Sequence, residues 1–151
     1  MPILTKRLNK TSLGLYVHVP FCRSKCEYCD FYSLACKDDR MLDGYLDAVC
    51  AHIKEAGALA PGYKVDTIYF GGGTPSFLGA DALATILTTI RRVFDVDPNA
   101  EITLEANPDS VSDQLLRRVR AEGFNRISLG VQTDDDELLK KLGRPHTYAQ
   151  A

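Results

Sequence analysis

The chain has 151 residues, of which 45% are hydrophobic and 25% are charged, as in a soluble globular domain with a substantial core. Its formal net charge of −2 gives no reason to expect nucleic acid or an anionic membrane surface as a partner. No apolar run approaches the roughly 20 residues that span a bilayer, so no transmembrane segment is predicted.

The apolar pattern alternates along the chain between strand-like and helix-like segments. The predicted strands cover residues 15–19, 65–70, 101–106 and 126–131. A helix is predicted after each of them. The first runs from Arg40 to a stop at Gly57, and the second spans residues 83–93. The third begins at an N-cap, Ser112, and ends at Gly123, and the fourth has capping-box spacing between Thr133 and Asp136.

This order predicts an α/β fold with a parallel sheet and with helices outside it. Four βα units cannot close an eight-unit barrel, so we expect the N-terminal part of a partial TIM-like (β/α) barrel, truncated after about four units. Residues 1–13 are interpreted as an N-terminal extension, and residues 14–151 as an incomplete core domain.

Three closely spaced cysteines, Cys22, Cys26 and Cys29, form a CxxxCxxC motif. Three thiolates can bind three irons of a [4Fe–4S] cube and leave the fourth iron for another ligand, most simply S-adenosylmethionine (SAM). Zinc is the alternative, with Cys36, Cys50 or His18 as a fourth ligand. The odd cysteine count and the lack of a signal peptide disfavour disulfides and favour a reducing compartment, the cytoplasm.

Further candidate residues follow the other predicted strands. Gly71–Thr74 follows the second strand, Glu105–Asn107 ends the third, and Gln132 follows the fourth. Ligands bind at the carboxyl ends of parallel strands in barrels and open sheets. The sequence therefore places all of these residues on one rim with the cysteines.

The cysteine motif, with an aromatic residue at Tyr28, resembles that of the radical SAM superfamily. The segments that carry a closer likeness are 16–22 (YVHVPFC), 71–76 (GGGTPS), 105–108 (EANP), 126–132 (RISLGVQ) and 143–146 (GRPH). As an ordered set they resemble the oxygen-independent coproporphyrinogen III oxidase family, and most closely its HemW branch of haem chaperones. In the oxidases a further cysteine lies two residues after the motif, where this chain has Phe31.

The resemblance implies roles for individual residues. Cys22, Cys26 and Cys29 are expected to be the cluster ligands. The residues expected to bind SAM are Tyr16, Tyr28, Gly72, Gly73, Thr74, Glu105, Gln132 and Arg144. Glu105 would meet the SAM ammonium or ribose hydroxyls, and Arg144 a carboxylate. The resemblance assigns no catalytic residue.

The function that the resemblance implies is that of a haem chaperone. Such a protein would bind a [4Fe–4S] cluster and SAM, take haem as cargo and deliver it to acceptor proteins. It would also need an electron donor. The first alternative is the oxidase itself, which decarboxylates coproporphyrinogen III by radical chemistry, so whether the protein is an enzyme stays open. The second alternative is a zinc-stabilised binding domain without catalysis.

Overall fold

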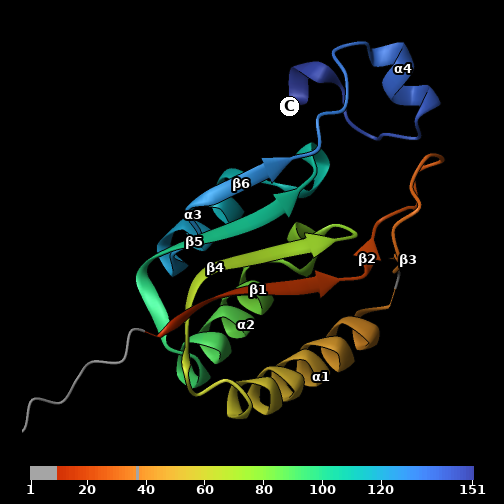
Figure 1. Ribbon diagram of the computed structural model, residues 1–151. Helices are drawn as coiled ribbons and strands as arrows, with labels where there is room; N and C mark the ends of the chain where they lie inside the picture. The colour runs from red at the N-terminus through yellow and green to blue at the C-terminus, as the bar shows by residue number, and fades with distance from the viewer. Residues whose placement is uncertain (1–9, 37) are drawn as a thin grey trace, which may run out of the picture.

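The computed structural model describes residues 10–36 and 38–151. Its centre is a parallel sheet with the strand order β1-β4-β5-β6, and the strands point the same way in Figure 1. The strands are β1 (Thr11–Val19), β4 (Tyr63–Gly72), β5 (Val96–Ala106) and β6 (Arg126–Leu129). The predicted α/β fold with parallel strands is confirmed.

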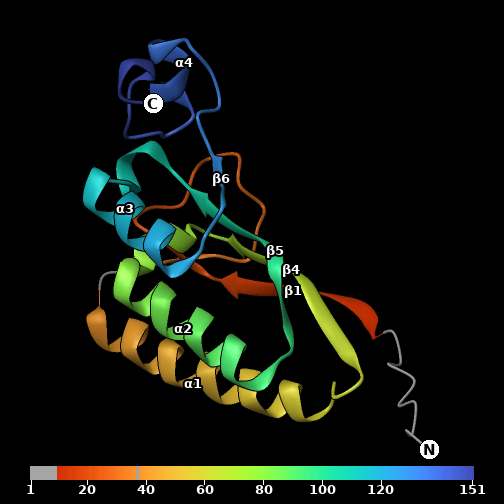
Figure 2. The ribbon, with the colours of Figure 1, turned by 90° about the vertical axis from the view of Figure 1, so that its left-hand side faces the viewer.

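Three helices lie on one face of this sheet, as Figure 2 shows. They are α1 (Asp39–Ala58), α2 (Ala80–Val93) and α3 (Asp113–Glu122). A fourth helix, α4 (Asp136–Lys141), lies beyond the carboxyl ends of the strands (Figure 1). Within the part of the chain that the structure describes, the opposite face carries no helix; we call it the open face.

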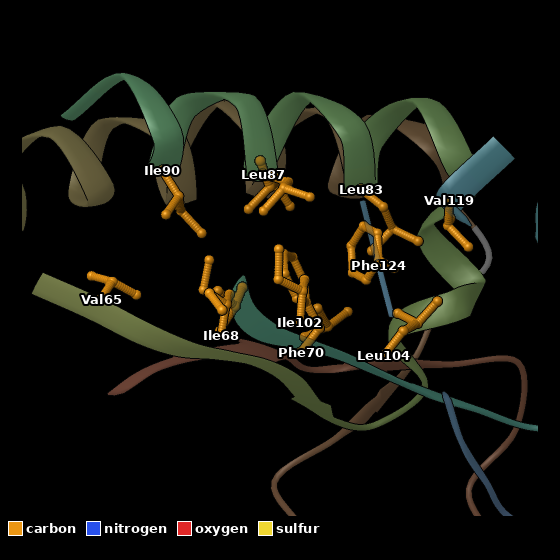
Figure 3. Packing of buried hydrophobic residues seen from close by; sticks show 14 of the residues in the cluster. Val65, Ile68, Phe70, Leu83, Leu87, Ile90, Ile102, Leu104, Val119 and Phe124 are labelled. Atoms are coloured by element: carbon orange, nitrogen blue, oxygen red, sulfur yellow. The ribbon is translucent and has the colours of Figure 1, made fainter. Parts of the chain in front are cut away.

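The core fills the space between the sheet and the helices. Leu83, Leu87 and Ile90 of α2 point toward strand residues that include Ile68 and Phe70 (Figure 3). Successive strand residues point to opposite faces, so the neighbours of these core residues point to the open face. Strand periodicity therefore buries one set of side chains and leaves the other set on the open face.

Two of the four predicted helix-end signals match the structure. The stop predicted at Gly57 is early, because α1 ends at Ala58 and its C-cap is Leu59. The Ser112 hydroxyl accepts a hydrogen bond from the Leu115 amide (3.2 Å), and Gly123 ends α3 with a φ of 105°. The prediction of Thr133 as the cap of α4 is wrong. Asp135 is the cap, and its carboxylate accepts from the Glu137 amide at 2.8 Å. A charged acceptor one residue from the helix interacts favourably with its N-terminal dipole.

The strand bounds also differ from the prediction. β1 begins at Thr11 and β5 at Val96, four and five residues before the predicted starts at Leu15 and Glu101, whereas β6 ends at Leu129. Polar and exposed residues continue the ladders because pairing uses the backbone and needs no apolar side chain. Of the predicted extension, residues 1–9 lie outside the described residues and residues 11–13 belong to β1.

The core predicts a clear difference between two leucines. Leu87→Ala removes a side chain that is 1% exposed and should lower the free energy of unfolding by about 2–5 kcal/mol. Leu59→Ala, at a position 84% exposed, should change it by less than about 0.5 kcal/mol. Urea unfolding followed by circular dichroism measures both values. Equal losses in the two variants would contradict this assignment of the core.

Candidate functional site

The cysteine loop is closed at its base by a small parallel pairing that the sequence did not predict. β2 (Phe21–Cys22) pairs with β3 (Leu34–Ala35). Phe21 is buried and packs edge-on against Tyr45 of α1, with ring centroids 5.2 Å apart. The loop that carries the three cysteines is thereby anchored to the sheet and to the first helix.

His18 ties the same loop to strand β1. Its Nε2 donates to the Tyr32 carbonyl at 3.0 Å, because a carbonyl oxygen can only accept. Nδ1 is then the acceptor for the Tyr16 hydroxyl at 3.1 Å. Both ring nitrogens are therefore occupied, and His18 is not available as a zinc ligand.

The three cysteines open onto one cavity of about 320 Å³ at the carboxyl ends of the strands. The predicted residues that line it are Cys22, Cys26, Cys29, Tyr28, Gly72, Gly73, Thr74, Glu105, Gln132 and Arg144. Tyr16 lies outside this lining, on the open face, where 59% of its surface is exposed. The structure thus brings together ten of the eleven residues that were predicted from separate segments.

The arrangement does not form a site for a single ion. Among residues 10–36 and 38–151, no three His, Cys, Asp or Glu side chains converge closely enough to hold one metal ion. The other cysteines face elsewhere, since the Cys36 thiol donates to the Asp38 carbonyl and Cys50 contacts Thr89. A tetrahedral zinc ion needs four ligands around one point, whereas a cube needs its thiolates at separate corners. The described side chains therefore do not form a four-ligand zinc site.

Arg144 is a buried cation in the wall of the cavity, with 8% of its surface exposed. Its Nη2 donates to the Asn107 side-chain carbonyl (2.6 Å) and to the Gly130 carbonyl (2.7 Å), and Nη1 approaches the Cys26 sulfur (3.5 Å). Within the described residues, its buried Nε has no hydrogen-bond partner. A buried guanidinium without a carboxylate partner suits an anionic ligand or a thiolate.

Asn107 links the two sides of the cysteine loop, a role that the sequence did not reveal. Its side-chain amide donates to the Thr74 hydroxyl at 3.1 Å while its carbonyl accepts from Arg144. The Thr74 hydroxyl in turn lies 3.5 Å from the Cys22 sulfur. A polar chain therefore connects Cys22 with Cys26. Its position at the end of the third strand had already placed Asn107 among the candidate residues of the rim, without this role.

The Glu105 carboxylate is held at both of its oxygens. The Tyr69 hydroxyl donates to Oε1 at 2.6 Å, and the Gly72 amide donates to Oε2 at 3.2 Å. The hydrogen bond to this carboxylate, followed by burial, raises the pKa of Tyr69 above its usual value. Tyr69 was missed by the sequence reasoning, although strand alternation places it on the open face with Tyr16.

The glycines at the end of β4 are required by the packing of the chain around them. Gly72 has a φ of 116°, in the region that favours glycine. A Cβ on Gly73 would lie 2.6 Å from the Phe21 carbonyl oxygen and 2.9 Å from the Cys22 sulfur. The second glycine therefore lets the turn pack against the cysteine loop itself.

Gln132 and Tyr28 complete the wall. Gln132 has a φ of 72°, an uncommon value for a residue with a Cβ, and the neighbouring Val131 carbonyl accepts from His146 at 3.2 Å. Tyr28 is half exposed, and burial raises its pKa, with the Arg144 cation acting in the opposite direction. These two side chains place an amide and an aromatic ring in the same cavity as the thiols.

None of the helices in the described ranges combines the length and the hydropathy needed to cross a membrane.

The chain is similar in sequence to known proteins. A model of the radical SAM superfamily matches residues 16–151. The chain is 43% identical over 139 residues to the heme chaperone HemW of Escherichia coli (strain K12), covering 92% of this chain and 37% of that protein. It is 41% identical over 140 residues to the heme chaperone HemW of Mycobacterium tuberculosis (strain H37Rv), covering 91% and 36%.

A solved structure of the coproporphyrinogen III oxidase HemN from Escherichia coli, described as a radical SAM enzyme, superposes with a TM-score of 0.87 at 32% identity. The match covers 93% of this chain and 32% of that one, so the fold is HemN-like. The chain spans little more than a third of the length of the curated relatives above. The match over residues 16–151 shows that the chain belongs to the radical SAM superfamily, which implies a [4Fe–4S] cluster and SAM as its cofactors.

Proposed function

We propose that Cys22, Cys26 and Cys29 hold the [4Fe–4S] cluster and that SAM binds beside it in the same cavity. The observation that carries this proposal is the single cavity that the three thiols share with the rim residues of three other strands. The donor set fits the group, because three thiolates ligate three irons and leave one open. When bound, the cluster supplies an electron for cleavage of the SAM sulfonium.

The residues around the thiols would bind SAM and exclude water. Glu105 would accept hydrogen bonds from the SAM ammonium or ribose hydroxyls, and the peptide groups of Gly72, Gly73 and Thr74 would lie beside them. Arg144 would pair with a carboxylate, supported by its burial and by an Nε that has no hydrogen-bond partner among the described residues. Gln132, Tyr28 and Tyr16 would supply amide and aromatic contacts.

For the whole protein, the function supported best is that of a haem chaperone in the cytoplasm. It would bind haem or a related porphyrin and transfer it to acceptor proteins, with an electron donor for the cluster. The support is the identity of 41–43% to proteins named heme chaperone HemW. Phe31 adds to it, because this cavity-lining residue stands where the oxidases have a further cysteine.

Coproporphyrinogen III oxidation is the second candidate function. It is favoured by the HemN-like fold, which extends over 93% of this chain. Fold alone does not decide between the two functions, since the same barrel serves many reactions.

The cluster assignment predicts a selective effect of cysteine replacement. Cys26→Ala should abolish the cluster, because the remaining two thiolates cannot hold three irons. Cys50→Ala, on α1, should leave about four irons and four sulfides per chain, as in the unmodified protein. Iron and sulfide analysis with visible absorption after anaerobic reconstitution measures this. A brown chromophore retained in Cys26→Ala would refute the assignment.

The SAM assignment predicts that Glu105→Gln weakens SAM binding. The change keeps the shape but removes the charge, and loss of a charged hydrogen bond costs about 1.5–3 kcal/mol, or roughly 10- to 150-fold in Kd. Glu101→Gln is the matched control, because it lies on the same strand and face but pairs with Arg126. Calorimetry on cluster-loaded protein gives both affinities. Equal affinity in the two variants would argue against this placement of SAM.

The chaperone assignment predicts that the full-length protein binds haem and does not convert coproporphyrinogen III. Haem titration followed by absorption tests the first part, and product analysis with SAM and a reductant tests the second. Phe31→Cys should not create the oxidase, because the substrate contacts would also have to be built. Accumulation of protoporphyrinogen IX by the unmutated protein would establish the enzyme instead.

A further inference from the structure

Tyr69 and Glu105 face each other across neighbouring strands on the open face. Tyr69 pairs in register with Thr103 of β5, so Glu105 lies two residues nearer the carboxyl end. Residues two apart on a strand share a face, and this diagonal neighbour is within reach of a long side chain. The hydroxyl spans the diagonal and donates to Glu105 Oε1 at 2.6 Å.

The second carboxylate oxygen of Glu105, Oε2, is held by the end of β4. The last register pair between β4 and β5 is Phe70 with Leu104, so the Gly72 amide lies past the ladder. It donates to Glu105 Oε2 at 3.2 Å. One carboxylate thus receives two donors from β4, and each of its oxygens keeps a second lone pair for a ligand.

Without the hydroxyl, the carboxylate would be less restrained. The terminal torsion of a glutamate has a broad, roughly two-fold preference, so a single amide donor leaves the group free to swing. Ordering it when a ligand binds would then reduce the affinity, since preorganisation saves that cost.

Tyr69 is itself held in place. Its ring stacks on that of Tyr16, with centroids 6.1 Å apart and planes at 25°. The Tyr16 hydroxyl is hydrogen-bonded to His18, which is in turn hydrogen-bonded to the Tyr32 carbonyl of the cysteine loop. The Tyr69 hydroxyl therefore approaches Glu105 from a supported position.

We propose that Tyr69 is a positioning residue whose hydroxyl holds the Glu105 carboxylate in the orientation that receives the ammonium of SAM. The proposal rests on the proposed function, which gives Glu105 its contact with SAM. It adds a second layer to that site, because Tyr69 does not line the cavity and reaches it through its hydrogen bond to Glu105.

The test is Tyr69→Phe, which removes one oxygen and keeps the stacked ring. In the full-length, cluster-loaded protein we expect the Kd for SAM, measured by calorimetry, to rise about 10-fold, at the scale of one lost hydrogen bond. Tyr63→Phe, at the exposed start of the same strand, is the matched control and should leave the Kd unchanged. Iron content and thermal melting should be equal in both variants.

A double-mutant cycle separates positioning from a structural effect. If Tyr69 acts through Glu105, then adding Tyr69→Phe to Glu105→Gln should weaken SAM binding by less than two-fold, because the amide has lost the charge that the hydroxyl positions. Full additivity of the two changes would overturn the proposal. An unchanged Kd in Tyr69→Phe, while Glu105→Gln weakens binding, would overturn it and leave the proposed SAM site intact. An unchanged Kd in Glu105→Gln would instead overturn the SAM site itself, and the role of Tyr69 with it.

Discussion

Parallel pairing of the strands is the constraint on which the rest of the structure depends. Because β1, β4, β5 and β6 run in one direction, the segments that follow them meet at a single edge. No segment contains more than part of the site: the first contributes the thiols, the second glycine amides, the third a carboxylate and the fourth a side-chain amide. The helices on one face supply the apolar core that keeps the strands in register, which leaves the open face for polar side chains.

The buried guanidinium of Arg144 also connects separate parts of the site. The Arg144 guanidinium reaches Asn107, the Gly130 carbonyl and the Cys26 sulfur, so it connects the β5 end, the β6 end and the cysteine loop. A buried cation is costly unless it is well hydrogen-bonded, and these contacts offset part of that cost. Ligand recognition and local stability therefore depend on the same side chain.

The sequence was sufficient where local chemistry sets the structure. The Ser112 cap, the Gly123 stop and the order of strands and helices follow from periodicity and capping, and the CxxxCxxC spacing marked the site. It was insufficient where contacts are made over long separations. Neither the pairing of β2 with β3 nor the bond from Tyr69 to Glu105 leaves a local pattern. The cap of α4 was missed because Thr133 and Asp135 both accept from nearby backbone amides, and only Asp135 accepts from amides of the helix itself.

The pairing of β2 with β3 at the base of the cysteine loop affects which sequence changes the loop can accept during evolution. Because β2 and β3 pair at the two ends of the loop, residues 23–33 lie between two fixed ends, and His18 and Arg144 contact the loop between them at Tyr32 and Cys26. Lengthening a flexible closed loop costs little, about 0.6 kcal/mol for each doubling. Insertions and replacements between the thiols and β3 can therefore remodel the mouth of the cavity while the barrel keeps its architecture.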